Sequence, residues 1–463
     1  SPDDKFILGE SRIFFQYPDY FPNNTRNICI NGILCSPASI GSSVVQVPFL
    51  FINHFFHLIS QDTVVFTADD FTDPHYVYWR NSINPDFTFL ELFFGPTLSA
   101  FGVGIFFLIL RTYGLSLTTS VTISLLFGFA TTVWSYSQTS LNVVPASLFI
   151  LLGFYFFRKF LNSSSKFNLL MSSVTLGFGF LVRPDTILFI IPLFFYFIFI
   201  VFKKSNKIKN LISFILPLSF SYMIHILIDK IRFGDTQQLP KYLPDNPIVS
   251  PVFTGVFGML FSPGVGLLVF SPILFTCFFS FFHFFQKNKS ECILFIVIIL
   301  TFLIFYGQSI AWHGLQSWSE RYLFVVTPFF LIPLGFSLEK FSSKMFTILL
   351  IGLGSLGVLF NISNLLTDVS WFIWGLMGSG KGLYELGHIT DTLWVSPLVL
   401  WTFEFSQLTH AIRYLFVSSE PDIYLLKLWG PYFYSIFFIL PVSLFYFLIK
   451  LNKKQEKINI SKS

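Results

Sequence analysis

Two acidic clusters in the N-terminal region have residue types and spacing that could support chemistry. Asp3 and Asp4 form a vicinal carboxylate pair, which could supply a general base and a ligand for a metal ion or substrate. Asp69 and Asp70 begin a second cluster, Asp-Asp-Phe-Thr-Asp-Pro-His, which is weakly compatible with Ca²⁺ or Mn²⁺ but lacks the pattern of a calcium loop. The simpler alternative for Asp3 and Asp4 is a solvated pair of charges. We assign no residue as a metal ligand.

Two arginines at the ends of apolar stretches form a second set of candidates. Arg183 lies in Leu-Val-Arg-Pro-Asp, and Arg321 follows a tryptophan-rich segment that contains His313. Charges are costly at such positions, so each arginine either snorkels and pairs with a nearby acid, Asp185 or Glu320, or binds a ligand. A guanidinium at headgroup depth could bind a phosphate with two parallel hydrogen bonds. Position alone favours the structural alternative for both arginines.

The composition indicates the environment in which these residues must work. Of 463 residues, 53% are hydrophobic, 66 are Phe and only 11% are charged, against about 25% charged residues in ordinary soluble domains. So few charges cannot cover the surface of a soluble fold. The composition excludes a cytosolic enzyme, a nucleic-acid-binding protein and a disulfide-stapled secreted module. It predicts an all-α integral membrane protein.

Apolar stretches long enough to cross a bilayer core of about 30 Å recur from residue 88 onward. They predict a bundle of about eleven transmembrane helices, with interfacial helices on the external loops. The expected spans are 88–110, 116–136, 143–158, 167–182, 185–202, 211–229, 265–285, 291–309, 322–338, 345–366 and 431–449. The chain then divides into a first loop region (1–87), a main bundle (88–366), a second loop region (367–430), and a last span with a basic tail (431–463).

The polar segments between these spans alternate in charge, and this pattern predicts the topology. Alternate segments, beginning at Arg111 and ending with the C-terminal tail, hold 17 of the 29 lysines and arginines but only three of the 24 acids. Cytoplasmic loops of membrane proteins are enriched in Lys and Arg. We therefore expect a multi-pass protein whose C-terminus is cytoplasmic. The long segments 1–87, 230–264 and 367–430 would face the periplasm, lumen or exterior.

Three shorter features also carry expectations. Segment 41–59 is apolar but interrupted by polar residues, so it is either an interfacial or re-entrant helix or a helix packed into the bundle. Segment 253–272 is rich in Gly and Pro but has no Lys, which excludes a nucleotide phosphate loop. It favours a hairpin at the membrane edge whose backbone closely approaches another element. Cys29 and Cys35 could form a disulfide if their region faces an oxidising compartment.

Several motifs occur along the chain in a characteristic order. They are Cys29-Ile-Asn-Gly-Ile-Leu-Cys-Ser-Pro37 continuing to Phe49, Trp134 to Pro145, Gly177 to Pro184, Arg232 to Asp235, Gly258 to Pro272 and Trp312 to Leu323. The last two are the most specific. In this order and spacing the motifs resemble polytopic membrane glycosyltransferases of the GT-C fold, in particular the dolichyl-phosphate-mannose-mannosyltransferase-like group that uses lipid carriers.

The resemblance implies a function and roles for the candidate residues. The donor would be a polyprenyl-phosphate-linked sugar, and an inverting transfer would move a hexose to a glycan, lipid or protein acceptor on the non-cytoplasmic face. An acid of the first external loop is the catalytic base in that fold, and Asp3 and Asp4 stand at the matching position. Arg183 and Arg321 would hold the phosphate of the departing lipid. A divalent cation is optional, and no other cofactor is implied.

Two other classes of function remain open. A transporter or flippase for a lipid-linked substrate would need polar groups along a central path, whereas the charges here lie almost wholly at the ends of spans. A non-catalytic subunit of a larger membrane assembly would have a blocked groove covered by partner chains. A lipid-sized groove that reaches Asp4 would favour the enzyme.

Overall fold

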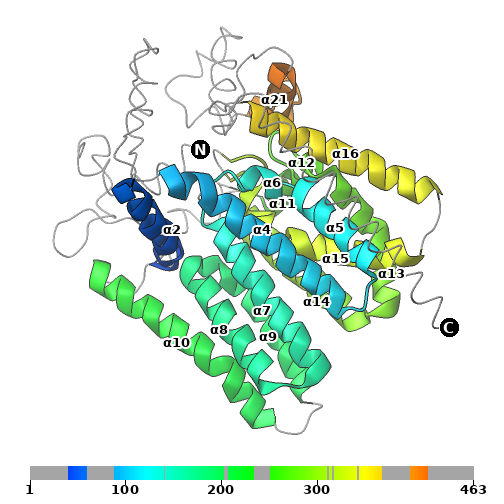
Figure 1. Cartoon of the computed structure of the whole chain (residues 1–463). Helices are drawn as coiled ribbons and strands as arrows, with labels where there is room; N and C mark the ends of the chain where they lie inside the picture. Colours follow the sequence, from blue (N-terminus) through cyan, green and yellow to red (C-terminus); the bar gives the residue numbers. More distant parts are fainter. Residues whose placement is uncertain are drawn as a thin grey trace. The chain divides into compact units, whose positions relative to one another are not determined.

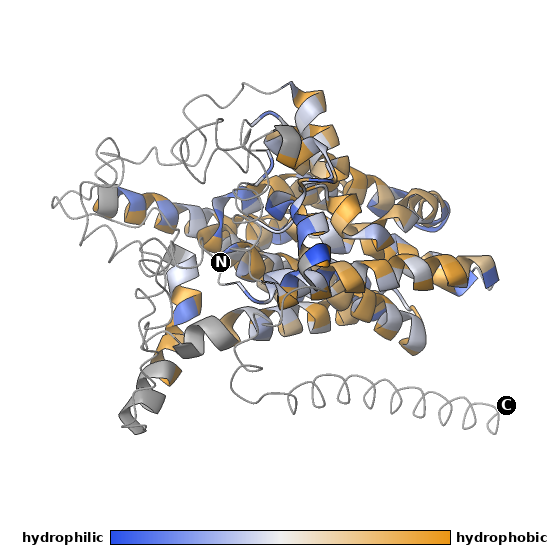
Figure 2. Cartoon of the chain, turned by 90° about the horizontal axis from the view of Figure 1, so that it is seen from above, coloured by the Kyte–Doolittle hydropathy of each residue, from blue (hydrophilic) through white to orange (hydrophobic). Residues whose placement is uncertain are grey.

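The structure is a computed structural model that is helical almost throughout the part it describes (Figure 1). The described residues are 40–59, 88–139, 141–202, 207–233, 251–309, 312–314, 317–340, 344–367 and 397–415. They contain no strand. Hydrophobic residues colour most of the helical ribbon (Figure 2). The all-α class predicted from the composition is confirmed for this part of the chain.

Seven helical segments are long and apolar enough to cross a membrane. They are Phe93–Thr112, Val143–Ser163, Pro184–Val201, Lys207–Ile231, Lys289–Gly307, Arg321–Lys340 and Lys344–Leu366. Each coincides with one of the expected spans. Together they indicate a multi-pass membrane protein.

The expected number of about eleven spans is not confirmed. Helices α5 (Leu117–Phe129) and α8 (Lys166–Val182) form where spans were expected, but they are only 13 and 17 residues long. The expected span 265–285 is broken into three short helices, because Pro272 lacks an N–H and disfavours helical geometry at Ser271. The expected span 431–449 lies outside the described residues.

The structure divides into two compact units. The first draws on Ser1–Ile109, Tyr136–Met259 and Ile293–Thr327. Its described elements include α2 (Ile40–Ile59), most of α4 (Thr88–Thr112), α7 (Val143–Ser163), α8, η4 (Pro184–Thr186), α9 (Ile187–Val201), α10 (Lys207–Phe233), most of α11 (Val252–Phe261), most of α14 (Lys289–Gly307) and η7 (Arg321–Val326).

Helix α8 packs against both α7 and α10 in the first unit (Figure 1). Small polar side chains make the close contacts: Ser172 Oγ donates to the carbonyl of Gly153 at 2.8 Å, and Ser173 Oγ donates to the carbonyl of Phe214. Phe197 fills the space beside Phe214, with ring centroids 4.6 Å apart. Because lipid is as apolar as these side chains, close packing and interhelical hydrogen bonds must hold the helices together.

Segment 41–59 forms helix α2, whose beginning packs onto the end of α8. A side chain at Gly41 would collide with the backbone of Leu181 and Val182, and Ser42 Oγ donates to the Val182 carbonyl at 3.2 Å. Val47 and Phe51 are exposed. The first turn of helix α2 is therefore packed against another helix, as the alternative of a helix packed into the bundle required. The exposed side chains of Val47 and Phe51 leave part of its apolar surface uncovered.

The expected close approach of segment 253–272 is found in α11. Gly255 lies against the backbone of Gly307 at the end of α14, and Gly258 lies against the ring of Trp312. A Cβ atom at either position would collide with its neighbour. These contacts fix the end of α14 and the segment that follows it.

The second unit draws on Leu110–Ser135, Leu260–Cys292 and Pro328–Ser463. Its described elements include α5, α12 (Leu267–Phe270), η6 (Pro272–Thr276), α13 (Cys277–Lys287), most of α15 (Thr327–Lys340), α16 (Lys344–Leu366), α20 (Pro397–Trp401) and α21 (Gln407–Leu415), with α6 (Val133–Tyr136) ending at the unit boundary. A buried hydrogen bond of 2.7 Å joins Ser135 to Asn361. None of the predicted site residues that the structure describes belongs to this unit.

Candidate anion-binding site

Pro184 ends helix α8 just before it and thereby fixes the backbone of Arg183. The residue before a proline disfavours helical geometry, and Arg183 is extended, with φ −152° and ψ 110°. The Gly179 carbonyl accepts both the backbone N–H of Arg183 and, at 3.1 Å, the Oγ1 hydroxyl of Thr186, which ties the turn to the helix end. Arg183 therefore leaves the helix at a fixed turn between α8 and α9.

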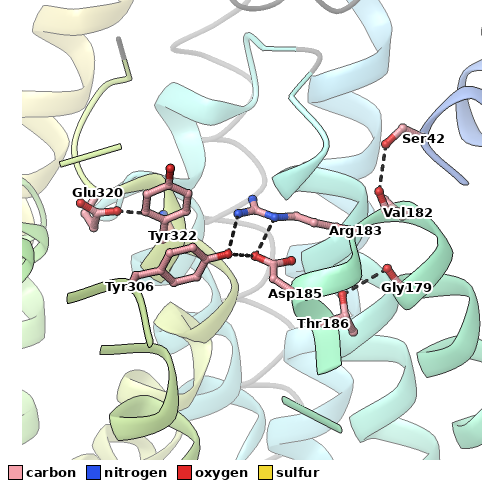
Figure 3. A network of polar contacts seen from close by, with 9 residues as sticks. All are labelled: Ser42, Gly179, Val182, Arg183, Asp185, Thr186, Tyr306, Glu320 and Tyr322. Atoms are coloured by element: carbon pink, nitrogen blue, oxygen red, sulfur yellow. Dashed lines mark hydrogen bonds and ion pairs between the residues drawn. The ribbon is translucent and has the colours of Figure 1, made fainter. Parts of the chain in front are cut away.

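Arg183 is held by two side chains, from η4 and from the end of α14 (Figure 3). Its Nε lies 2.8 Å from Asp185 Oδ2, and its Nη2 donates to Tyr306 Oη at 3.3 Å. The Tyr306 hydroxyl in turn donates to Asp185 Oδ2. The side chains of Arg183 and Asp185 are 11% and 14% exposed. The pairing of Arg183 with Asp185 that the sequence suggested is present, and Tyr306 closes it into a triangle.

Arg321 and Arg183 both lie beside the ring of Tyr322. The Tyr322 ring stacks on Tyr306, with centroids 4.0 Å apart and planes 8° apart. Arg183 Cζ lies 5.8 Å from the Tyr322 ring centroid, and Arg321 Cζ lies 5.3 Å from it. Both distances are within the range of cation–π attraction. The two arginines predicted from the sequence thus converge on one tyrosine, and all of these side chains are partly exposed.

Two residues that precede Arg321 have positive φ, Gly314 (69°) and Ser319 (62°). Ser317 Oγ donates to the carbonyls of both residues at 3.1 Å. Glu320 then caps η7: its Oε1 accepts the backbone N–H of Tyr322 at 3.1 Å. Because Glu320 is extended, successive side chains point in opposite directions, so Glu320 is buried while Arg321 reaches the surface.

Titratable groups are buried close to the two arginines. Burial raises the pKa of Glu320 to about 8, against the opposing effects of the Tyr322 N–H and both arginines. Burial and the charge of Arg321 lower the pKa of His313 to about 4. Tyr136 is buried, donates to the Ser319 carbonyl at 3.5 Å, and has its pKa raised by burial. Near pH 7, Glu320 and His313 are therefore mostly neutral.

This arrangement can bind an anion. Asp185 forms an ion pair with Arg183, and the charges of both arginines act on Glu320, which is mostly protonated near pH 7. Guanidinium groups donate in a planar fork that matches phosphate and carboxylate oxygens. The described residues hold no group of three His, Cys, Asp or Glu that could bind a metal ion.

The structure describes some of the predicted site residues and leaves others outside its described part. Arg183, Arg321 and His313 belong to the first unit, with both arginines at Tyr322 and His313 close enough for the charge of Arg321 to act on it. The four acids predicted in the N-terminal region lie outside the described residues: Asp3, Asp4, Asp69 and Asp70. Cys29 and Cys35 lie outside them too.

Three tyrosines and one buried pair were not predicted. Tyr306, Tyr322 and Tyr136 carried a usable signal, because tyrosines at the ends of apolar spans are typical of membrane interfaces. In α10, His225 Nε2 lies 3.5 Å from Asp229 Oδ2, and both side chains are buried. Their i,i+4 spacing inside an apolar helix was the available signal for that pair.

Comparison with known proteins finds no matching family model, no matching curated protein and no matching solved structure.

Proposed function

We propose that this chain is a membrane glycosyltransferase that transfers a sugar from a polyprenyl-phosphate donor to an acceptor on the non-cytoplasmic side. The observation that carries the proposal is the convergence of Arg183 and Arg321 on Tyr322 at the ends of apolar helices. A lipid phosphate lies at headgroup depth, where the ends of spans lie. The resemblance of the sequence motifs to GT-C enzymes supplies the sugar chemistry.

In the proposed reaction, the acceptor oxygen bonds to the anomeric carbon of the donor sugar while the bond from that carbon to the phosphate oxygen breaks. The bonding electrons pass to the polyprenyl phosphate, which gains negative charge. Arg183 and Arg321 stabilise that charge with hydrogen bonds that strengthen as it develops. The acceptor proton passes to Asp3 or Asp4, the acids at the position of the catalytic base in the resembling family.

Binding of the donor to variants of the two arginines tests the site. Lysine keeps the charge but loses the planar fork. In lipid nanodiscs, Arg183→Lys and Arg321→Lys should each weaken binding of a polyprenyl-phosphate hexose by about 1.5–3 kcal/mol, roughly 10- to 100-fold. The matched control is Arg158→Lys, which replaces a buried arginine of α7. Donor binding to both site variants at the wild-type level would overturn the proposal.

Transfer activity tests the base. The double variant Asp3→Asn with Asp4→Asn should abolish sugar transfer and retain donor binding, because a base acts on the acceptor hydroxyl and not on the phosphate. Asp69→Asn should transfer sugar as the wild type does. The opposite pattern would show that the base is wrongly assigned. Donor binding without transfer by the wild-type chain across a panel of acceptors would favour a non-catalytic subunit.

A further inference from the structure

Glu320 is a buried carboxyl with one oxygen that finds no partner. Its side chain is 0% exposed. Oε1 accepts the Tyr322 N–H, whereas Oε2 has no hydrogen-bond partner within the described part of the chain. A buried carboxylate with an unsatisfied oxygen is costly when it is charged. The same group is cheaper to bury when it carries a proton.

The charged groups around Glu320 come from several elements. Arg321 begins η7, Arg183 lies between α8 and η4, and the charges of both act on the Glu320 carboxyl. Tyr136 of α6 faces it as well. Around Arg183 lie Asp185 of η4 and Tyr306 of α14, which hold that arginine in its ion pair. Figure 3 shows Tyr322 drawn between Glu320 and Arg183.

The protonation state of Glu320 changes the charge close to the two arginines. An ionised Glu320 places a negative charge near them, whereas a protonated Glu320 is neutral. An anion on the arginines would place a second negative charge near the carboxyl and so favour its protonated form.

We propose that Glu320 is a positioning residue that holds a proton whenever a lipid phosphate occupies the two arginines, so that phosphate binding and proton uptake are linked. The inference rests on the proposed function, since it takes Arg183 and Arg321 as the phosphate site. It adds a role for a residue that contacts neither the sugar nor the phosphate directly.

The direction of the pH dependence follows from the pKa of Glu320. Burial raises this pKa to about 8. Bound phosphate favours the protonated form, so affinity should be constant at lower pH and fall as the pH rises past about 8. Well above that pH the affinity for phosphate should fall by about tenfold per pH unit, because one proton is taken up for each phosphate bound. His313, with a pKa of about 4, stays neutral across this range.

A phosphodiester probe isolates this effect, because its single charge does not titrate near neutral pH. Farnesyl methyl phosphate should bind to the wild-type chain in nanodiscs with proton uptake near pH 8 and none at pH 6, measured by calorimetry in buffers of different ionisation enthalpy. Glu320→Gln should bind with wild-type affinity at pH 6, without proton uptake at any pH. The matched control is Glu291→Gln. It replaces another buried carboxyl, in the first turn of α14, at the other end of that helix from Tyr306, and it should keep the proton uptake.

The outcomes separate the two proposals. Binding without proton uptake by the wild type, or uptake that persists in Glu320→Gln, overturns the role of Glu320 and leaves the phosphate site intact. No binding at any pH overturns the phosphate site and the linkage with it. Should Glu320→Gln fail to fold, infrared difference spectra of the wild-type chain report the carboxyl directly. A protonated-carboxyl band that grows on probe binding at pH 8 supports the inference, and an unchanged band overturns it.

Discussion

Arg183 and Arg321 each have an acid close in sequence, yet the two acids do different things. Asp185 forms an ion pair with Arg183 at 2.8 Å, and both side chains retain some exposure. Glu320 is fully buried and caps η7 through the Tyr322 N–H. One acid therefore holds its arginine in an ion pair, whereas the other caps a helix from a buried position.

The difference comes from backbone geometry. Asp185 lies two residues after Arg183, inside the 3-10 turn that Pro184 begins, and this turn brings both side chains to the same side. Glu320 lies directly before Arg321 on extended backbone, where adjacent side chains point to opposite sides. An opposite charge next to an arginine in sequence is thus not evidence of an ion pair. The local dihedral angles decide it.

Replacing Asp185 and Glu320 one at a time should give the largest effect, because the two variants should lose different amounts of stability. Asp185→Asn leaves Arg183 partly buried without its counter-ion and should lower the free energy of unfolding by about 2–3 kcal/mol, below the range for fully buried pairs. Glu320→Gln keeps an oxygen that can accept the Tyr322 N–H and should cost less than about 1 kcal/mol. Thermal unfolding of both variants in nanodiscs checks the order. Equal losses would contradict the distinction between the two acids.

Replacing the shared ring should weaken both arginines together. Tyr322→Leu keeps apolar bulk but removes the π face beside Arg183 and Arg321, each contact being worth about 0.5–1 kcal/mol at a partly exposed position. Donor affinity should fall about tenfold. Titration of the donor into the nanodisc-embedded variant measures this effect. Unchanged affinity would show that Tyr322 does not organise the arginines.

Removing a single hydroxyl should affect only the Arg183 side. Tyr306→Phe preserves the stack on Tyr322 but deletes the hydrogen bonds to Arg183 and Asp185. The expected loss of donor affinity is about 0.5–1.5 kcal/mol, with the proton uptake near Glu320 unchanged. Calorimetry of the variant checks both values. A loss of proton uptake would mean that the two sides of the site are not separable.

Much of the fold and part of the site were predictable from the sequence. Seven of the expected spans coincide with long apolar helices, because an apolar run of that length is itself the signal. The span predicted at 265–285 is not one continuous helix, because the hydrophobic pattern does not reveal the break at Ser271-Pro272. The family resemblance assigned Arg183 and Arg321 to one phosphate, and both lie beside the Tyr322 ring. The positions of Tyr306 and Tyr322 at span ends were a usable signal for interfacial tyrosines, but local composition could not show that their rings stack on each other.

A double-mutant cycle on the two arginines tests most directly whether they form one phosphate site. Donor affinity is measured for the wild type, Arg183→Lys, Arg321→Lys and the double variant. If both arginines hold the same phosphate, the double variant should lose less than the sum of the single losses, with a coupling energy of about 1 kcal/mol or more. Losses that add to within about 0.5 kcal/mol would place the two arginines in separate sites and contradict the account.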